Sequence, residues 1–328
     1  MGGEGTLVVS LDFELNWGVR DQVSLDRYGA NLRGAREVIP RLLERFEAHG
    51  VRATWATVGM LFCESKEELL ARAPERRPAY AHPELSPYPH IATIGADERA
   101  DPLHFAPSLV RRIAAAEGQE VATHTFSHFY CLEPGQTQAD FEADLRAAVD
   151  VARAAGIELS SIVFPRNQVN PAYLPVCARL GLIAYRGNPT GPVYSPRSEA
   201  SDTPLRRAGR LLDSYAPLYR AGGSLPETPA PEQLVDVRAS RFLRPRPRSG
   251  VLARLEPRKV ARVLGEMGHA ASAGTVYHLW WHPHNFGVDQ DLHLTQLDAL
   301  LERFVRLRDE GAMRSLTMAE LAREQRAT

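Results

Sequence analysis

The sequence predicts an α/β fold, in which a parallel sheet, open or closed into a barrel, carries two long loop insertions. Two observations lead to this prediction. Short apolar segments typical of buried strands alternate with amphipathic helical segments along the whole chain. Two stretches dense in Pro and charge, about 64–106 and 188–256, interrupt that alternation. Because there is no internal repeat and no clean linker, we expect residues 1–328 to form one domain.

The first half of the chain predicts three strands and three helices. Between 34 and 49, apolar residues recur at helical spacing and Gly50 ends the pattern. Pro40, inside this pattern, predicts a kink or a later helix start. The strands are expected at 6–12, 51–58 and 119–123, and the helices at 34–49, 106–118 and 138–155.

The second half repeats the alternation around the second insertion. Pro171 suits the first turn of a helix, where its missing N–H costs nothing. The strands are expected at 159–165, 182–187 and 275–281, and the helices at 171–181, 257–272 and 294–310.

Composition argues against some classes of protein and indicates the cellular compartment. A net charge of −1 gives no general attraction to nucleic acid or to an anionic membrane. Three cysteines in 328 residues suggest reduced thiols rather than a disulfide framework. The N-terminus lacks the pattern of a signal peptide, and no apolar run approaches the about 18 residues of a membrane span. We therefore expect a cytoplasmic protein without a membrane span.

Chemically reactive side chains follow four of the predicted strands, each at the strand's carboxyl end. In barrels and open parallel sheets this edge carries the active site, because the strand-to-helix loops open there. Chance could place reactive residues at the end of one strand, but it would rarely place them at the ends of four. The residues are Asp12, Glu14, His124, His128, Arg166, His282 and His284.

The types of residue at these ends suit metal-assisted hydrolysis. Two imidazoles and one carboxylate form a common catalytic zinc set that leaves a coordination position for water. A second carboxylate can accept the proton of that water, and a further histidine can protonate a leaving group. An isolated pair such as His124 and His128 would more often lie at the surface or cap a helix. The other strand-end residues favour metal ligation instead.

Four segments give a family resemblance. In this order, "SLDFE", "HTFSH", "FPRNQVNP" and "HLWWHPHNFG" resemble the polysaccharide deacetylases of the NodB-homology type, also grouped with carbohydrate esterase family 4. The resemblance spans roughly residues 6–325. It implies a distorted (β/α) barrel that uses a divalent metal, for which we expect Zn²⁺, to remove acetyl groups from sugars.

Through this resemblance, the expected metal ligands are Glu14, His124 and His128. The His-Thr-x-x-His signature of the family is matched fully. The first motif departs from the family, in which two adjacent aspartates act as base and ligand. Here Phe13 follows Asp12, so the ligand role passes to Glu14, in the Asp-x-acid spacing of a subgroup.

The resemblance also implies the catalytic roles. Asp12 is the expected general base and His282 the expected general acid. Arg166 is expected to orient Asp12 by a charge-assisted hydrogen bond, although its motif is Phe-Pro-Arg rather than Phe-Arg. The Asp-x-x-Asp-Trp segment of the family has no clear match. Asp213 is the candidate for its orienting carboxylate.

Candidate substrate contacts are aromatic or polar neighbours of these residues. His284 and Asn285 closely follow the expected acid His282, although Asn285 could instead cap the following turn. Trp280 and Trp281 alternate along a strand, so one of them is expected in the core and one beside the substrate. We assign the substrate face to Trp281 and, with core packing as the alternative, to Trp17.

Residues 238–259 hold eight basic residues against one acid. Such a segment is either a solvated loop of biased composition or a lid that faces the phosphate of a nucleotide sugar or a lipid-linked sugar. The sequence leaves both readings open.

The leading hypothesis is a metal-dependent N-deacetylase of an intracellular acetamido sugar or sugar conjugate. The substrate would be a precursor of a surface polysaccharide, a lipid-linked sugar or a metabolite of the aminoglycoside type. Two alternatives remain. One is a metal-independent hydrolase of a non-sugar amide on the same scaffold, and the other is a catalytically degenerate carbohydrate-binding protein.

Overall fold

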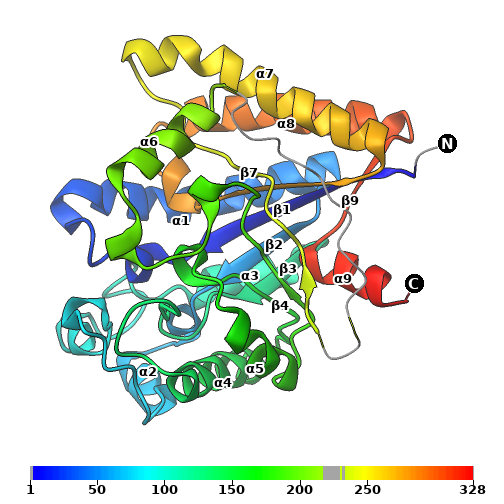
Figure 1. The fold of residues 1–328 in the computed structure, drawn as a ribbon. Helices are drawn as coiled ribbons and strands as arrows, with labels where there is room; N and C mark the ends of the chain where they lie inside the picture. The colour runs from blue at the N-terminus through cyan, green and yellow to red at the C-terminus, as the bar shows by residue number, and fades with distance from the viewer. Residues whose placement is uncertain (1–2, 217–229, 231–232, 328) are drawn as a thin grey trace.

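The computed structural model describes residues 3–216, 230 and 233–327, and one nine-stranded parallel sheet organises them (Figure 1). The strand order is β6-β5-β4-β3-β2-β1-β8-β7, with β9 paired to the start of β1. The strands are β1 Gly5–Phe13, β2 Ala53–Thr57, β3 Gln119–Thr123, β4 Ser161–Ile162, β5 Ala184–Tyr185, β6 Val235–Asp236, β7 Arg241–Phe242, β8 Val276–Trp281 and β9 Met313–Ser315.

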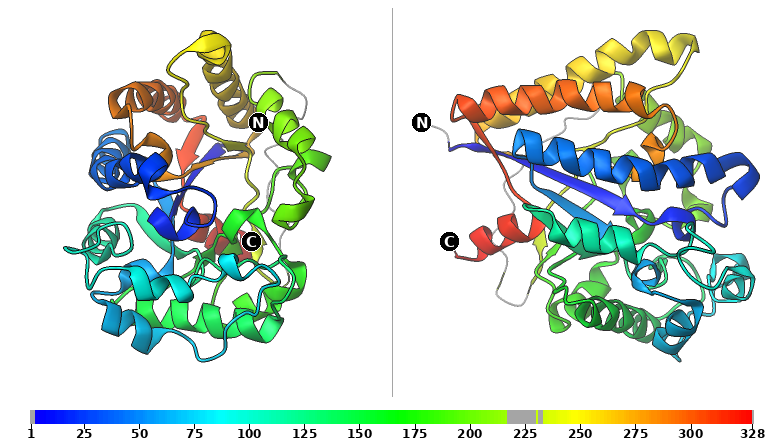
Figure 2. Two further views of the ribbon diagram at one scale, coloured as in Figure 1. Left: turned by 90° about the vertical axis from the view of Figure 1, so that its left-hand side faces the viewer. Right: turned by 180° about the vertical axis from the view of Figure 1, so that it is seen from behind.

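The sheet curls into a half-barrel with helices around it (Figure 2), which confirms the predicted fold class. The described chain begins at β1 and ends with α9, on the side of the sheet away from the edge toward which β1 points (Figure 1). The helices are α1 Leu25–His49, α2 Lys66–Arg72, α3 Pro107–Ala115, α4 Gln138–Ala154, α5 Leu174–Arg179, α6 Pro204–Asp213, α7 Gly250–Ala273, α8 Gln290–Asp309 and α9 Met318–Ala327. None of the helices in the described residues is long and apolar enough to cross a membrane.

Two helices begin earlier than the apolar pattern predicts. Helix α1 begins at Leu25 rather than at 34 and runs through Pro40 to the left-handed Gly50. Its first two turns are largely exposed, so they carry little of the apolar periodicity on which the prediction depends. Helix α7 likewise begins at Gly250 rather than at 257.

The second insertion is more than a loop, which corrects the prediction for 188–256. It supplies α6, the start of α7 and the two edge strands β6 and β7. The short connection 237–240 therefore runs from one edge of the curled sheet to the other. Residues 217–229 and 231–232 of this insertion lie outside the described part.

Strand β1 lies at the centre of the core. All nine of its residues are buried, and it pairs with β2 on one side and β8 on the other. Phe46 of α1 packs edge-to-face against Trp55 of β2 and Trp281 of β8, with ring centroids 6.2 Å apart in each case. Burial of such aromatic surface supplies much of the driving force for folding.

A close backbone contact fixes the turn that follows β8. This turn, Pro283–Phe286, packs against α1. A Cβ atom on Gly34 of α1 would lie 1.7 Å from the carbonyl oxygen of Gly287, and one on Gly287 would lie 2.0 Å from the carbonyl oxygen of Asn31. Only glycine fits at either position, so α1 determines where the end of β8 lies.

Gly34→Ala should therefore destabilise the protein by about 1–3 kcal/mol, the usual cost of overpacking. The matched control is Gly265→Ala in α7, where a new Cβ meets no atom within 4 Å. This control should stabilise the helix by about 0.5–1 kcal/mol through reduced backbone entropy of the unfolded chain. Urea unfolding measures both changes. Equal stability of the two variants would contradict the close-contact argument.

Candidate active site

The carboxyl ends of β1, β3, β5 and β8 bring seven polar side chains together at one edge of the half-barrel. Six of them were predicted from the sequence, and Arg186 was not. All seven except His282 are at least nine-tenths buried. The seven are Asp12, Glu14, His124, His128, Arg186, His282 and His284.

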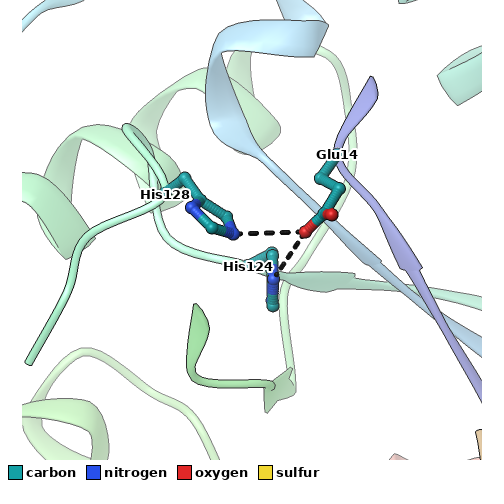
Figure 3. Close-up of side chains that lie close together, drawn as sticks. All are labelled: Glu14, His124 and His128. Carbon is teal, nitrogen blue, oxygen red and sulfur yellow. Dashed lines mark hydrogen bonds and ion pairs between the residues drawn. The ribbon is translucent and has the colours of Figure 1, made fainter. Parts of the chain in front are cut away.

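Glu14, His124 and His128 form the first cluster (Figure 3). The Nε2 atoms of His128 and His124 lie 3.1 Å and 3.4 Å from Oε2 of Glu14. Burial alone would raise the pKa of Glu14, but the charge of His282 and the bonds from the two imidazoles hold it well below its usual value. The group is therefore a buried carboxylate that faces two ring nitrogens.

The donor set fits a divalent cation. His124 donates from Nδ1 to the carbonyl oxygen of Val163 at 2.8 Å, so in the neutral ring the lone pair of Nε2 points toward Glu14. Burial lowers the pKa of His128 to about 4 despite the carboxylate beside it, so the His128 ring is neutral near pH 7. A lone pair and a carboxylate that face each other in a buried site need a cation between them. Two imidazole nitrogens and one carboxylate oxygen are ligands typical of Zn²⁺.

The loop that carries both histidines is strained and firmly held. Thr125 and His128 adopt positive φ angles of 63° and 59°, which non-glycine residues rarely do. Asp144 of α4 accepts hydrogen bonds from the backbone N–H of Phe126 at 2.8 Å and of Ser127 at 3.3 Å, and from the Ser127 hydroxyl. Burial outweighs these bonds and raises the pKa of Asp144 to about 6.

Asp144 was missed from the sequence, although a signal was present. It lies on the buried face of α4 between Phe141 and Leu145, where an unpaired carboxylate would be costly. An acid on the apolar face of an amphipathic helix indicates a specific buried partner, and here the partner is the histidine loop.

Asp12 pairs with Arg186 and not with Arg166, so the predicted orienting arginine was wrong. The two guanidinium nitrogens of Arg186 lie 2.6 Å and 2.7 Å from the two carboxylate oxygens of Asp12. Arg166 instead donates to Asp21 at 2.5 Å and lies over the ring of Tyr130. The φ angle of 53° at Arg166 turns the chain after β4 and directs this side chain away from Asp12.

The rule that found the other residues also applies to Arg186, because it directly follows β5. Its pairing decides the charge of Asp12. Burial would raise the pKa of this carboxyl, but the charge of Arg186 and its hydrogen bonds to the carboxylate lower it. Asp12 is therefore ionised near pH 7.

A chain of hydrogen bonds fixes Arg186. Its Nη1 also donates to the hydroxyl oxygen of Ser10 at 3.1 Å, and that hydroxyl lies 2.8 Å from Nε2 of His278. The other ring nitrogen, Nδ1, lies 2.9 Å from the carbonyl oxygen of Val237. Burial lowers the pKa of His278 to about 3, so the ring is neutral, donates to Val237 and accepts the proton of Ser10. The hydroxyl proton of Ser10 and the ring proton of His278 then each have an acceptor.

His282 lies between the two carboxylates. Its Nε2 is 3.6 Å from Oδ2 of Asp12 and 3.7 Å from Oε1 of Glu14. Its Nδ1 lies 3.3 Å from the side-chain oxygen of Asn285, so Asn285 orients the ring. His284 stacks on His282 with centroids 4.8 Å apart, and its Nε2 is 3.9 Å from Glu14. Glu14, His282 and His284 thus form a second group with metal-ligating geometry.

The structure places both predicted substrate-facing tryptophans in the core. A cavity of about 480 Å³ opens beside His282, and Trp280 lines it. Trp281, predicted to face the substrate, is fully buried and stacks on Phe286. Trp17 is also fully buried and donates from Nε1 to the carbonyl oxygen of His104. Both have the core-packing role that was the alternative.

Asp213 has a structural role away from Asp12 and His282. It pairs with Arg241 at 3.3 Å and with Arg262 at 3.2 Å, and it accepts a hydrogen bond from Tyr194. The prediction that it orients a catalytic residue was therefore wrong. It helps to fix the wall of the cavity, because Tyr194 and Arg241 both line that wall.

The comparisons with known proteins agree with this geometry. Residues 28–185 match the family model described as polysaccharide deacetylase. A solved structure from Mycobacterium smegmatis, described as a polysaccharide deacetylase, is similar with a TM-score of 0.59 and 15% identity over 99% of this chain and 91% of that chain. No curated protein sequence matches the chain significantly.

Two further solved structures share the fold. The Puue allantoinase aligns with a TM-score of 0.54 and 11% identity over 98% of this chain and 90% of that one. A 4-alpha-glucanotransferase from Thermococcus litoralis aligns with a TM-score of 0.53 and 11% identity over 98% of this chain and 40% of that one. At such identities the similarity concerns the fold.

Arg186→Met should destabilise the protein by about 3–5 kcal/mol, because it leaves the buried carboxylate of Asp12 uncompensated. The control is Arg52→Met, which removes a part-exposed pair with Glu320 and should cost about 1 kcal/mol or less. Urea unfolding measures both. Adding Asp12→Asn to Arg186→Met should restore part of the loss, and no restoration would count against the pairing.

Asp144→Ala should weaken Zn²⁺ affinity roughly 10–100-fold, because the histidine loop loses three hydrogen bonds that hold it. Asp150→Ala, on the exposed face of the same helix, is the control and should leave the affinity unchanged. Competition against a chromophoric chelator gives both affinities. An Asp144→Ala protein that binds Zn²⁺ as tightly as the wild type would refute this supporting role.

Proposed function

Because residues 28–185 match the polysaccharide deacetylase family model, we propose that the protein is a metal-dependent hydrolase that removes the acetyl group from an N-acetylated sugar or sugar conjugate. The family and the fold support a hydrolase that acts on acetyl groups. The observation that carries metal dependence is the buried cluster of Glu14, His124 and His128, which offers two ring nitrogens and a carboxylate oxygen within 4.8 Å of one another.

These three side chains would hold the ion, with Zn²⁺ as the expected occupant. Bound there, the ion would supply Lewis-acid polarisation of the acetyl carbonyl and would acidify a water molecule. Val163 and Asp144 would keep the ligands in place, the first through Nδ1 of His124 and the second through the loop backbone.

Asp12 would act as the general base. It is ionised, and each of its oxygens keeps a lone pair beyond the bond to Arg186. In the first step the water oxygen bonds to the acetyl carbon while Asp12 takes the water proton. Arg186 acts as a positioning residue, since it holds the carboxylate in one orientation.

His282 would act as the general acid. Its Nε2 faces the same space as Asp12 and Glu14, and Asn285 orients the ring through Nδ1. In the second step the carbon–nitrogen bond breaks, and the departing amine takes the proton of His282. The products are acetate and the free amino sugar, so atoms and charge balance.

The two alternatives are less well supported. A metal-independent amide hydrolase has no need for two imidazole nitrogens that face a buried carboxylate. The likeness to an allantoinase concerns the shared fold. A binding protein without catalysis would have no need for an ionised carboxylate and a histidine 3.6 Å apart beside a cavity.

Metal content tests the cluster. Protein purified without chelators should contain about one equivalent of Zn²⁺ or a similar ion, as expected for one closed set of ligands. His124→Ala should lose it, while His269→Ala, an exposed histidine on α7, should retain it. Elemental analysis gives the result. A wild type that takes up no metal after dialysis against Zn²⁺ would overturn metal dependence.

Acetate release from acetamido sugars tests the roles of base and acid. Asp12→Asn and His282→Asn should each lower kcat by about 10²–10⁴-fold, the usual contribution of a general acid or base. Both variants should keep their metal, since neither belongs to the first cluster. Asp26→Asn, on the exposed start of α1, is the control. Full activity of either site variant would remove that residue from the mechanism.

A further inference from the structure

The cavity beside His282 has an unusual charge. It has a volume of about 480 Å³, which suits a small ligand, and the second insertion provides much of its wall. Two acids, Glu199 and Asp202, line it. Five arginines also line it, namely Arg166, Arg197, Arg210, Arg241 and Arg244.

Three of these arginines are neutralised within the protein. Arg166 pairs with Asp21 and Glu199. Arg210 lies 2.6 Å from Asp202. Arg241 pairs with Glu266 at 2.7 Å and with Asp213 at 3.3 Å. The two acids of the lining are therefore already engaged.

The other two arginines have no carboxylate partner among the residues that the structure describes. Arg244 donates from Nε to the hydroxyl oxygen of Ser214 at 2.9 Å. Arg197 donates only to backbone carbonyl oxygens, those of Ser195 and Ser201. Burial and the nearby charge of Arg210 lower the pKa of Arg244, the effect expected of an uncompensated cation.

The wall nearest His282 is aromatic. Trp280 and Phe242 pack with ring centroids 4.6 Å apart, and the ring centroids of Trp280 and His282 are 5.7 Å apart. Trp280 is 9% exposed, and its Nε1 atom is buried without a hydrogen-bond partner in the described structure. Arg186 lies over the Trp280 ring, 4.0 Å from its centroid, so this aromatic wall offers a sugar an apolar contact only where it borders the cavity.

We propose that this cavity binds a phosphate ester on the acetamido sugar, with the sugar near Trp280 and the phosphate at Arg197 and Arg244. This inference rests on the proposed deacetylation and specifies its substrate. A phosphate monoester or a diphosphate carries about two negative charges, which match two unpaired guanidinium groups. A polycationic metabolite of the aminoglycoside type would be repelled.

Isothermal titration with the protein as purified tests the proposal. The probes are N-acetylglucosamine 1-phosphate and the uncharged methyl glycoside of N-acetylglucosamine. The phosphate should bind roughly tenfold or more tightly, as expected for charge-assisted hydrogen bonds, and added salt should reduce the difference. Arg244→Gln and Arg197→Gln should each remove most of this preference without weakening the neutral probe.

Arg254→Gln is the matched control, an exposed arginine of the same Arg-rich segment outside the cavity, and it should bind as the wild type does. Thermal unfolding shows whether each variant is folded. If Arg244→Gln fails to fold, Arg197→Gln carries the test. Equal affinity for the two probes, or a preference that survives both substitutions, would overturn the phosphate site.

Two further probes separate the source of the phosphate. A nucleoside diphosphate N-acetylglucosamine and a short prenyl diphosphate N-acetylglucosamine share the diphosphate, so tighter binding of either supports the site and assigns its source. Acetate release separates the two proposals. Phosphate-dependent binding without acetate release under any metal would overturn deacetylation alone. Equal kcat/KM for neutral and phosphorylated sugars would overturn the phosphate site alone.

Discussion

Two carboxylates buried at the end of the central strand are the constraint on which the site depends. Asp12 and Glu14 are only 3% and 4% exposed, and an ionised carboxylate in such surroundings needs a positive partner. Asp12 has one in Arg186, which follows β5 and bonds both of its oxygens. Glu14 has only imidazoles, and the ring nitrogen of His124 that faces it carries a lone pair. A bound cation would resolve this imbalance.

The rest of the edge is built to hold these groups in place. Among the described residues, five non-glycine residues with positive φ angles lie in the loops that carry or adjoin the site. These five are Leu15, Thr125, His128, Arg166 and Asn167. Such strain persists only where packing imposes it, and Asp144 does so for the histidine loop, while the Gly34–Gly287 contact positions the turn after β8. The geometry of the site is thus supported by helices α1 and α4.

The sequence predicted the parallel α/β fold and most of the site because one rule covers both. Residues at the carboxyl ends of parallel strands meet at one edge, whatever the loops between them do. The rule failed for Arg166, because the left-handed turn after β4 redirects that side chain, and no residue pattern reveals such a turn. The rule also applies to Arg186, which directly follows β5 and was missing from the prediction.

The tryptophans show a different limit. Both faces of β8 are buried, so alternation along the strand does not indicate which of Trp280 and Trp281 faces the cavity. The second insertion was beyond prediction for a similar reason, since β6 and β7 are two residues each and too short for a periodic signal. Yet this insertion supplies much of the cavity wall and both arginines that have no carboxylate partner in the described part of the chain. The proposed substrate choice therefore depends on the second insertion, the part of the chain whose structure was predicted least well from the sequence.

Anomalous diffraction at the zinc absorption edge, from crystals soaked in Zn²⁺, tests the central claim most directly. The account predicts a peak about 2.0–2.2 Å from Nε2 of His124, Nε2 of His128 and a carboxylate oxygen of Glu14, the usual distances for these ligands. No peak at that point, or a peak only between Glu14, His282 and His284, would contradict the assignment of the metal to the histidine loop.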